Sequence, residues 1–469
     1  MFDMGHSGQD GGATAWIILV IVAQKQWVGQ MNARVTMALL LAFSAAVPVA
    51  SLAQVAPALA PRAAQPAPAT APQRSTDPLA PAGTAAAPAP AAPVAPVEVP
   101  PPLWQVAAAE ELLGYIRGIG RDGLDPADYD PVRLEAAIRG GDQQLLAQAA
   151  TTSFRKLGRD LALGHVPKSG RTQWFVKDPD LDGGKLDQLL LQVAGGGRVA
   201  ETLNGLLPTH PQYGSLRQAL VVAKPGDTAS INKIRLNMDR WRWLPRDLGQ
   251  RYIIVNVPGQ FATLVENSQT RWKHRAIAGA TKTPTPQLAV QATGVILNPW
   301  WEVPPSLTGE VAGKAGYVAV RGKDGKVQRW RQPPGSRNAL GKIKFVMQNP
   351  QNIYLHDTNN RGLFDSRARF LSHGCIRTEN ILDLAAELLS DDGGEFTQER
   401  IDGVLASGKT VQANFVKPLP VYIVYFSTAA LTDGSLVQYN DLYGRDGAVL
   451  AALNDRTPGA AKPTQTAAR

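Results

Sequence analysis

Cysteine is nearly absent from this sequence of 469 residues, which contains one, Cys375. A single thiol excludes an intrachain disulfide and a C-x-x-C metal site. Histidine is also scarce, with six in the chain, and one of them, His373, lies two positions before Cys375. A lone cysteine is most often a small buried apolar residue. The residues around Cys375 must therefore show whether it fills a core or acts as a nucleophile.

Long hydrophobic runs are lacking as well. Residues 31–53 combine a basic start at Arg34, a short apolar run and small residues at Ser51 and Ala53, which is typical of a secretory signal cleaved after Ala53. The run is too short and too rich in alanine for a good membrane span. A second short run at 15–23 indicates either that Met31 is the true start or, alternatively, an uncleaved membrane anchor.

Large apolar residues are almost missing from 54–102, which consists mainly of alanine and proline. Such a segment cannot bury a core, and we expect an extended, disordered linker. The net charge of +9 is spread among loops. These basic residues either form solvated faces or suit the binding of an anionic polymer. No recognition helix or zinc-finger spacing supports nucleic acid as a partner.

Two kinds of periodicity divide the rest of the chain and predict an α+β protein. Residues 103–235 have helical spacing, with Leu103, Val106, Leu112, Leu113, Ile116 and Ile119 expected on one face. From 236 to 450 the pattern predicts a mainly β, sandwich-like domain, interrupted by one helix directly after Cys375. A stretch at about 304–335, rich in Gly, Pro and basic residues, is expected to form a lid over a cleft. Residues 451–469 are expected to be a disordered tail.

Nucleophilic cysteine chemistry requires a thiolate, a base that forms it, a group that orients the base and donors for the developing oxyanion. The stretch IYLHDT places His356 at the end of an expected strand, nineteen positions before Cys375. Gly374 directly precedes the cysteine, so backbone N–H groups can approach a bound carbonyl without an intervening side chain. The parts needed for acyl transfer are present.

The pattern H-x15-S-H-G-C-I-R, from His356 to Arg377, resembles the signature of the L,D-transpeptidases, the YkuD-type enzymes that remodel peptidoglycan. The likeness covers roughly residues 103–450 and extends to the large periplasmic members of that family. Those members usually carry a small helical peptidoglycan-binding module, for which the interval before the catalytic part is too short here. The segments that resemble the large members are 123–129, 240–245, 298–304, 331–345 and 354–364.

This resemblance implies acyl transfer on peptidoglycan stem peptides, which serve as donor and acceptor, without a metal or nucleotide cofactor. Cys375 would attack the carbonyl of the third stem residue, a diamino acid such as meso-diaminopimelate, and expel the terminal D-alanine. The side-chain amine of a second stem would take the acyl group and give a 3→3 cross-link. The expected location is the periplasm, in association with the cell wall.

The resemblance also implies roles for single residues. Cys375 is the expected nucleophile and His356 the expected base, oriented by a main-chain carbonyl near Asp357. The N–H groups of Gly374 and Cys375 are expected to form the oxyanion hole, with the Tyr354 hydroxyl as a candidate third donor. In an extended stretch, residues two apart lie side by side on one face, so a histidine at 373 is poorly placed to reach the sulfur.

The remaining candidates have two interpretations each. Arg377 either binds a stem carboxylate through its fork or pins the loop by an ion pair. Ser372 is interpreted as orienting the loop, and His373 as shaping it and assisting the oxyanion hole. Trp300 and Trp301 either line the cleft or pack in the core or the lid.

Two alternatives to a transpeptidase stay open. An L,D-carboxypeptidase, in which water resolves the acyl-enzyme, would carry the same motif. A catalytically inactive wall-binding scaffold would carry a damaged motif, whereas every motif residue is in place here. A papain-like hydrolase is disfavoured because its cysteine precedes its histidine.

Overall fold

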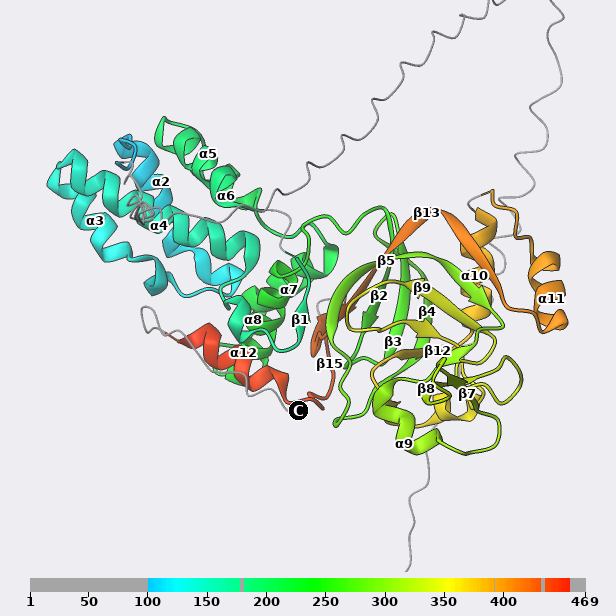
Figure 1. The fold of residues 1–469 in the computed structure, drawn as a ribbon. Helices are drawn as coiled ribbons and strands as arrows, with labels where there is room; N and C mark the ends of the chain where they lie inside the picture. The colour runs from blue at the N-terminus through cyan, green and yellow to red at the C-terminus, as the bar shows by residue number, and fades with distance from the viewer. Residues whose placement is uncertain (1–99, 178–180, 392, 432–434, 456–469) are drawn as a thin grey trace, which may run out of the picture. The chain divides into compact units, whose positions relative to one another are not determined.

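The computed structural model describes residues 100–177, 181–391, 393–431 and 435–455 (Figure 1). The expected signal at 31–53 and nearly all of the expected linker lie outside these residues. Within the described ranges, no helix combines the length and the apolar character needed to cross a membrane. Localisation and anchoring therefore stay predictions.

The first part of the described chain is helical. An exposed N-cap starts its longest helix: the side chain of Asp142 accepts hydrogen bonds from the N–H groups of Gln144 (2.8 Å) and Leu145 (3.1 Å). The helices are α2 (Val106–Arg117), α3 (Pro131–Gly140), α4 (Gln143–Leu163), α5 (Gly183–Ala194), α6 (Val199–Asn204), α7 (Pro211–Val222) and α8 (Thr228–Arg242).

The apolar face expected along the first of these helices is confirmed for part of its length. Leu112, Ile116 and Ile119 are fully buried. The prediction is wrong for Leu103 and Val106, which are 69% and 42% exposed. Leu103 precedes the helix, and Val106 begins it at an end that faces solvent.

Asp239 of α8 lies in a buried polar network of the helical part. Its buried carboxylate accepts hydrogen bonds from the N–H groups of His165 (2.8 Å) and Val166 (3.1 Å) and from the indole N–H of Trp243 (2.9 Å). The buried Arg242 guanidinium lies 3.4 Å away. Helix α8 is thereby tied to the loop that follows α4.

We expect Asp239→Ala to lower the free energy of unfolding by about 3–5 kcal/mol, because it leaves three N–H donors without their acceptor and removes the carboxylate beside the buried Arg242 guanidinium. Urea unfolding followed by circular dichroism measures this. Asp227→Ala is the matched control on the same helix: it removes an exposed cap from Ser230 N–H and should cost about 1 kcal/mol. Equal losses in the two variants would contradict the interpretation.

Most strands of the second part form one sheet that closes on itself (Figure 1). β5 lies beside β13, followed by β2, β3, β4, β12, β10 and β9, and β9 pairs with β5 again. The expected sandwich-like layout is therefore a closed ring. The strands of the ring are β2 (Arg251–Asn256), β3 (Phe261–Glu266), β4 (Gln269–Gly279), β5 (Gln287–Leu297), β9 (Ile343–Met347), β10 (Leu355–His356), β12 (Ile376–Thr378) and β13 (Val411–Val424).

Shorter elements complete this part. β1 (Trp174–Phe175) pairs with β5, β11 (Phe370–Ser372) pairs with β4, and β14 (Thr428–Ala430) pairs with β15 (Leu436–Gln438). The helix expected after Cys375 is confirmed as α10 (Ile381–Asp391), which contacts β13. The remaining helices are α11 (Gln398–Ser407) and α12 (Arg445–Asn454), so the prediction of a disordered tail is wrong for residues 451–454.

Residues of the helical part and residues of the strands pack in one apolar core. The α+β class expected from the sequence is compatible with such a shared core but does not require it. Trp241 of α8 stacks on Phe426, with ring centroids 4.4 Å apart. The Gln212 side chain of α7 donates to the carbonyl of Ala430 in β14 at 2.8 Å. The boundary expected at 235/236 falls inside α8.

The expected lid folds as a small unit, which we call the lid subdomain (301–332). Its three strands, β6 (Trp301–Glu302), β7 (Val318–Arg321) and β8 (Val327–Gln332), form a sheet of their own in the order β6–β8–β7. Figure 1 shows β7 and β8 of this sheet beside α9. Helix α9 (Thr308–Val311) lies between β6 and β7. Buried Val303, Leu307 and Val311 form its core.

Candidate active site

The loop that carries Cys375 connects β11 to β12. Gly374 has a φ of +115°, a left-handed conformation that L side chains rarely adopt. A Cβ added there would also meet the Ile353 side chain at 3.3 Å. The glycine before the cysteine therefore serves the sharp turn of the loop.

Ser372 braces this turn from inside. Its hydroxyl accepts the Gly374 N–H at 3.1 Å and donates to the Cys375 carbonyl at 2.5 Å. The side chain is buried, which agrees with the structural interpretation of Ser372. The expectation that Gly374 N–H belongs to an oxyanion hole is wrong for this conformation, because that donor is already used. Among hydrogen bonds between described residues, none uses the Cys375 N–H, so it is free to face a substrate.

Two threonines that the sequence did not single out hold the loop against the sheet. Thr283 Oγ1 donates to the Ser372 carbonyl at 3.1 Å. Thr285 Oγ1 donates to the Gly374 carbonyl at 2.8 Å and accepts the Gly279 N–H at 2.9 Å. No local motif marks them, because they come from the segment that joins β4 to β5.

The strand register places five side chains on one face. His356 of β10 lies directly opposite Arg377 of β12 and Lys344 of β9. Leu355 and Ile376, the next residues along, are fully buried in the core of the ring. Since side chains alternate along a strand, His356, Arg377 and Lys344, together with Tyr354 and Cys375 two positions away, face outward from the ring.

Cys375 is partly buried among polar groups. Its sulfur lies 3.5 Å from the Asn352 carbonyl, to which the thiol donates. Burial raises the pKa of the thiol, while hydrogen bonding with Tyr354 and the positive charges of Lys344 and Arg377 oppose that rise. Burial likewise raises the pKa of the Tyr354 hydroxyl, which interacts with both Cys375 and Trp301. Tyr354 thus lies between the nucleophile and the lid subdomain.

His356 is a neutral histidine at physiological pH. Only 5% of it is exposed, and burial, with a further contribution from Arg377, lowers its pKa to about 3. The Asp357 main chain favours the protonated form, but Nδ1 has no hydrogen-bond partner of good geometry among the described residues. The main-chain carbonyl near Asp357 that was expected to orient His356 is therefore close to the imidazole ring but does not form a hydrogen bond of good geometry with it.

Neither histidine of the motif is hydrogen-bonded to the sulfur in the part of the chain that the structure describes. His356 shares the outward face with Cys375, and its ring centroid is 5.7 Å from that of Tyr354. His373 is half exposed, and its Nε2 lies 3.8 Å from Glu310 of α9. This arrangement favours His356 as the base and places His373 at the edge of the lid subdomain.

The two tryptophans have different surroundings. Trp301 packs against the core of the lid subdomain and makes an edge contact with Tyr317 at 6.2 Å between centroids. Trp300 is covered by the Arg331 guanidinium, 4.1 Å from the ring centroid. Trp301 alone reaches Tyr354, so it is the one that contacts the site.

Comparison with known proteins identifies the family. A family model of the L,D-transpeptidase (YkuD) catalytic domain matches residues 250–412, and one of a scaffold domain matches 100–220. A Haemophilus influenzae protein described as a putative L,D-transpeptidase is 30% identical over 392 residues, which cover 75% of this chain and 77% of the relative. The chain belongs to the L,D-transpeptidase family.

Solved structures of L,D-transpeptidases are more distant. Those of a variant from Enterococcus faecium and of an enzyme from Mycobacterium smegmatis are each 12% identical to this chain, with TM-scores of 0.21. The matches cover 39% and 37% of this chain and 52% and 58% of the solved chains. The chain thus spans little more than half the length of these two structures.

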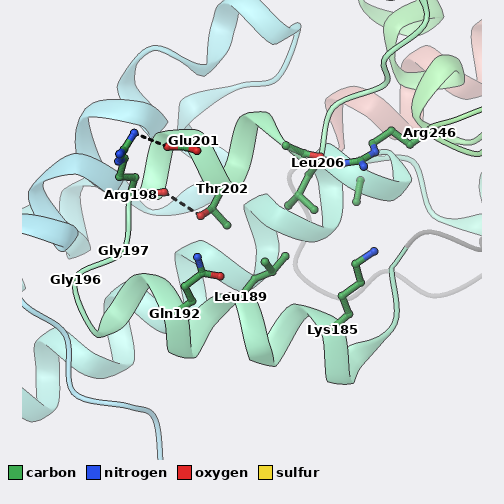
Figure 2. A pocket seen from close by; sticks show the side chains of 12 residues that line it. Lys185, Leu189, Gln192, Gly196, Gly197, Arg198, Glu201, Thr202, Leu206 and Arg246 are labelled. Atoms are coloured by element: carbon green, nitrogen blue, oxygen red, sulfur yellow. Dashed lines mark hydrogen bonds and ion pairs between the residues drawn. The ribbon is translucent and has the colours of Figure 1, made fainter.

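The helical part of the chain contains a cavity of about 760 Å³ (Figure 2). The residues that line it are far from Cys375 in the sequence. α5 and α6 line it, and Arg198 at its rim pairs with Glu201 at 2.9 Å. The residues that line it include no cysteine or histidine. Among the described residues, no group of three or more His, Cys, Asp or Glu is arranged to hold a metal ion.

Proposed function

We propose that this L,D-transpeptidase uses Cys375 to form an acyl-enzyme with the third residue of a tetrapeptide stem, releases D-alanine and makes 3→3 cross-links in peptidoglycan. The observation that carries the proposal is the face shared by Cys375, His356 and Tyr354, where β10 and β12 pair beside the lid subdomain. The family membership supplies the class of substrate.

The proton transfers follow from the protonation states of the site. Neutral His356 accepts the thiol proton as sulfur attacks the carbonyl of the third residue. The Cys375 N–H and the Tyr354 hydroxyl, which stays protonated because burial raises its pKa, donate to the oxyanion. His356 then passes the proton to the nitrogen of D-alanine, and the C–N bond breaks to leave a thioester.

The second half of the reaction reverses these steps with another amine. The side-chain amine of an acceptor stem gives a proton to His356 and attacks the thioester. Collapse of the intermediate expels the Cys375 thiolate, which takes that proton back. Stem peptides are thus the proposed partners for both halves, and the signal pattern at 31–53 supports a periplasmic location at the wall.

A carboxypeptidase is the second candidate, because water could resolve the same thioester. Partial burial of Cys375 and the adjoining lid subdomain favour an amine acceptor, since both limit the access of water. Mass spectrometry of purified muropeptides incubated with residues 54–469 tests the proposal. Cross-linked dimers support it, trimmed tripeptides indicate the carboxypeptidase, and unchanged substrate would contradict both enzymatic functions.

The lid subdomain can be removed without cutting the ring. Val303 N–H donates to the Trp330 carbonyl at 2.9 Å, so a Gly/Ser bridge of about four residues can replace 304–329. We expect the shortened protein to label at Cys375 at least as fast as the full chain, but to form fewer cross-links and more trimmed tripeptide.

The exposed tip of the β7–β8 hairpin offers a control for this deletion. Lys323→Ala changes only that tip and should leave labelling and product ratio as they are. If the shortened protein lost labelling, cross-linking and thermal stability together, the segment would be part of the core and not a lid.

A further inference from the structure

Two cations flank the proposed base, and neither is paired with a carboxylate among the residues that the structure describes. Lys344 and Arg377 lie on either side of His356 in the strand register. Over the described ranges, no carboxylate forms an ion pair or hydrogen bond with either side chain, and Arg377 Nε is buried without any partner. Two acidic groups act on Lys344 through space, the Cys375 thiol when it is ionised and Glu302. Glu302 is itself paired with Arg329 at 3.0 Å, and the ionised Cys375 thiol also acts on Arg377.

This placement is costly without a ligand. Both cations are partly buried, and burial lowers the pKa of each. Lys344 Nζ lies 4.0 Å from the centroid of the Tyr354 ring, which gives it a weak cation–π contact in place of a counter-charge. Charged groups out of water are normally paired. An anion supplied from outside the chain would satisfy both cations at once.

The geometry places that anion next to the reacting carbonyl. Cys375 directly precedes β12, and Arg377 is the middle residue of that strand. The two side chains act on each other electrostatically, so they lie close together. In an amino acid leaving as an amine, the carboxyl carbon is three bonds from the attacked carbonyl carbon, a separation of about 3–4 Å. A carboxylate at that position falls within reach of both cations.

We propose that Lys344 and Arg377 form a clamp for the terminal α-carboxylate of the residue that leaves the donor peptide. The clamp makes this a selective enzyme for donors whose free carboxylate lies one residue beyond the scissile bond. The identity of the substrate in this inference rests on the proposed function, whereas the unpaired positive charges are a property of the part of the chain that the structure describes. Lys344 is the added specificity residue, and it was not among the site residues expected from the sequence.

A pair of thiol reagents tests the clamp without any peptidoglycan. Iodoacetate and iodoacetamide are nearly the same size and alkylate the same sulfur, but only iodoacetate carries a carboxylate. Because Cys375 is the single cysteine, the loss of thiol reports one site. We expect the ratio of the iodoacetate rate to the iodoacetamide rate to fall roughly fivefold in Lys344→Met, as for the loss of one partly exposed charge pair.

Two further variants complete this test. Lys344→Arg should keep the wild-type ratio, and Lys342→Met, which removes an exposed charge from the same segment, should leave it unchanged. If Lys344 only favoured the thiolate, both reagents would slow equally in Lys344→Met. An unchanged ratio in that variant would therefore overturn the clamp, whatever happened to the separate rates.

A matched pair of donors connects the clamp to turnover. The two donors are a tetrapeptide stem with a C-terminal carboxylate and the same stem with a C-terminal amide. The wild-type protein should have a kcat/KM about tenfold higher for the carboxylate stem, and Lys344→Met should lose most of that preference. Equal turnover of both stems by the wild-type protein would overturn the clamp and leave the proposed function standing. Turnover of neither stem would contradict the proposed function, and the reagent ratio would still decide the clamp.

Discussion

Cys375→Ala should abolish acyl transfer and leave the fold intact. Loss of the nucleophile is expected to lower the rate of D-alanine release by more than about 10⁴-fold, because no other thiol in the chain can form the thioester. The side chain is small and only partly buried at the edge of the core, so the free energy of unfolding should fall by no more than about 1 kcal/mol.

The measurement combines turnover, mass and stability. Released D-alanine and cross-linked muropeptides report activity, and thermal unfolding reports the fold. Intact-protein mass spectrometry supplies the control, since a thiol reagent should add one label to the wild-type chain and none to Cys375→Ala. Retained turnover in the variant would remove Cys375 from the mechanism and end the proposed chemistry.

His356→Gln should produce the second largest loss, about 10²–10⁴-fold in kcat/KM for acylation. Gln keeps a polar side chain of similar size but cannot accept the thiol proton. Because burial lowers the pKa of His356 to about 3, the base is already neutral in weakly acidic solution. The wild-type acylation rate should therefore stay nearly flat between about pH 5 and pH 8 instead of falling below the ordinary histidine value of about 6.5.

His373→Gln is the matched control from the same motif. His373 is half exposed and contacts Glu310 of the lid subdomain, so we expect a loss of only a few-fold with an unchanged pH profile. If His373→Gln gave the larger loss, the role of base would pass to that residue. An acylation rate that fell with an apparent pKa near 6.5 would contradict the neutral, buried state of His356.

The same buried histidine makes folding sensitive to acid. Its folded pKa is lowered below the unfolded value, so the unfolded chain binds more protons as the pH falls from about 6.5 toward about 3, and the folded state loses stability over that window. The contribution is fully present only above the unfolded pKa. His356→Gln should flatten the pH dependence of the unfolding midpoint in that range.

The sequence by itself determined the elements and the nucleophile. Helical and alternating periodicities are local properties, so the helices before Arg242 and the strands after Arg251 were predictable from single stretches of chain. The helix after Cys375 was predictable for the same reason, because its apolar spacing and the glycines that end it are contiguous. The motif from His356 to Arg377 is also contiguous, and it was sufficient to indicate cysteine-based acyl transfer and the family.

The tertiary structure alone decided how these parts meet. Closure of the sheet depends on β9 pairing with both β5 and β10, a register between segments far apart in the chain that no local pattern encodes. The same pairing brings Lys344 beside His356. Packing also buries His356, which lowers its pKa. It likewise places the Ser372 hydroxyl where it accepts the Gly374 N–H. Residue types specify what chemistry is available, but distance and desolvation decide which groups perform it.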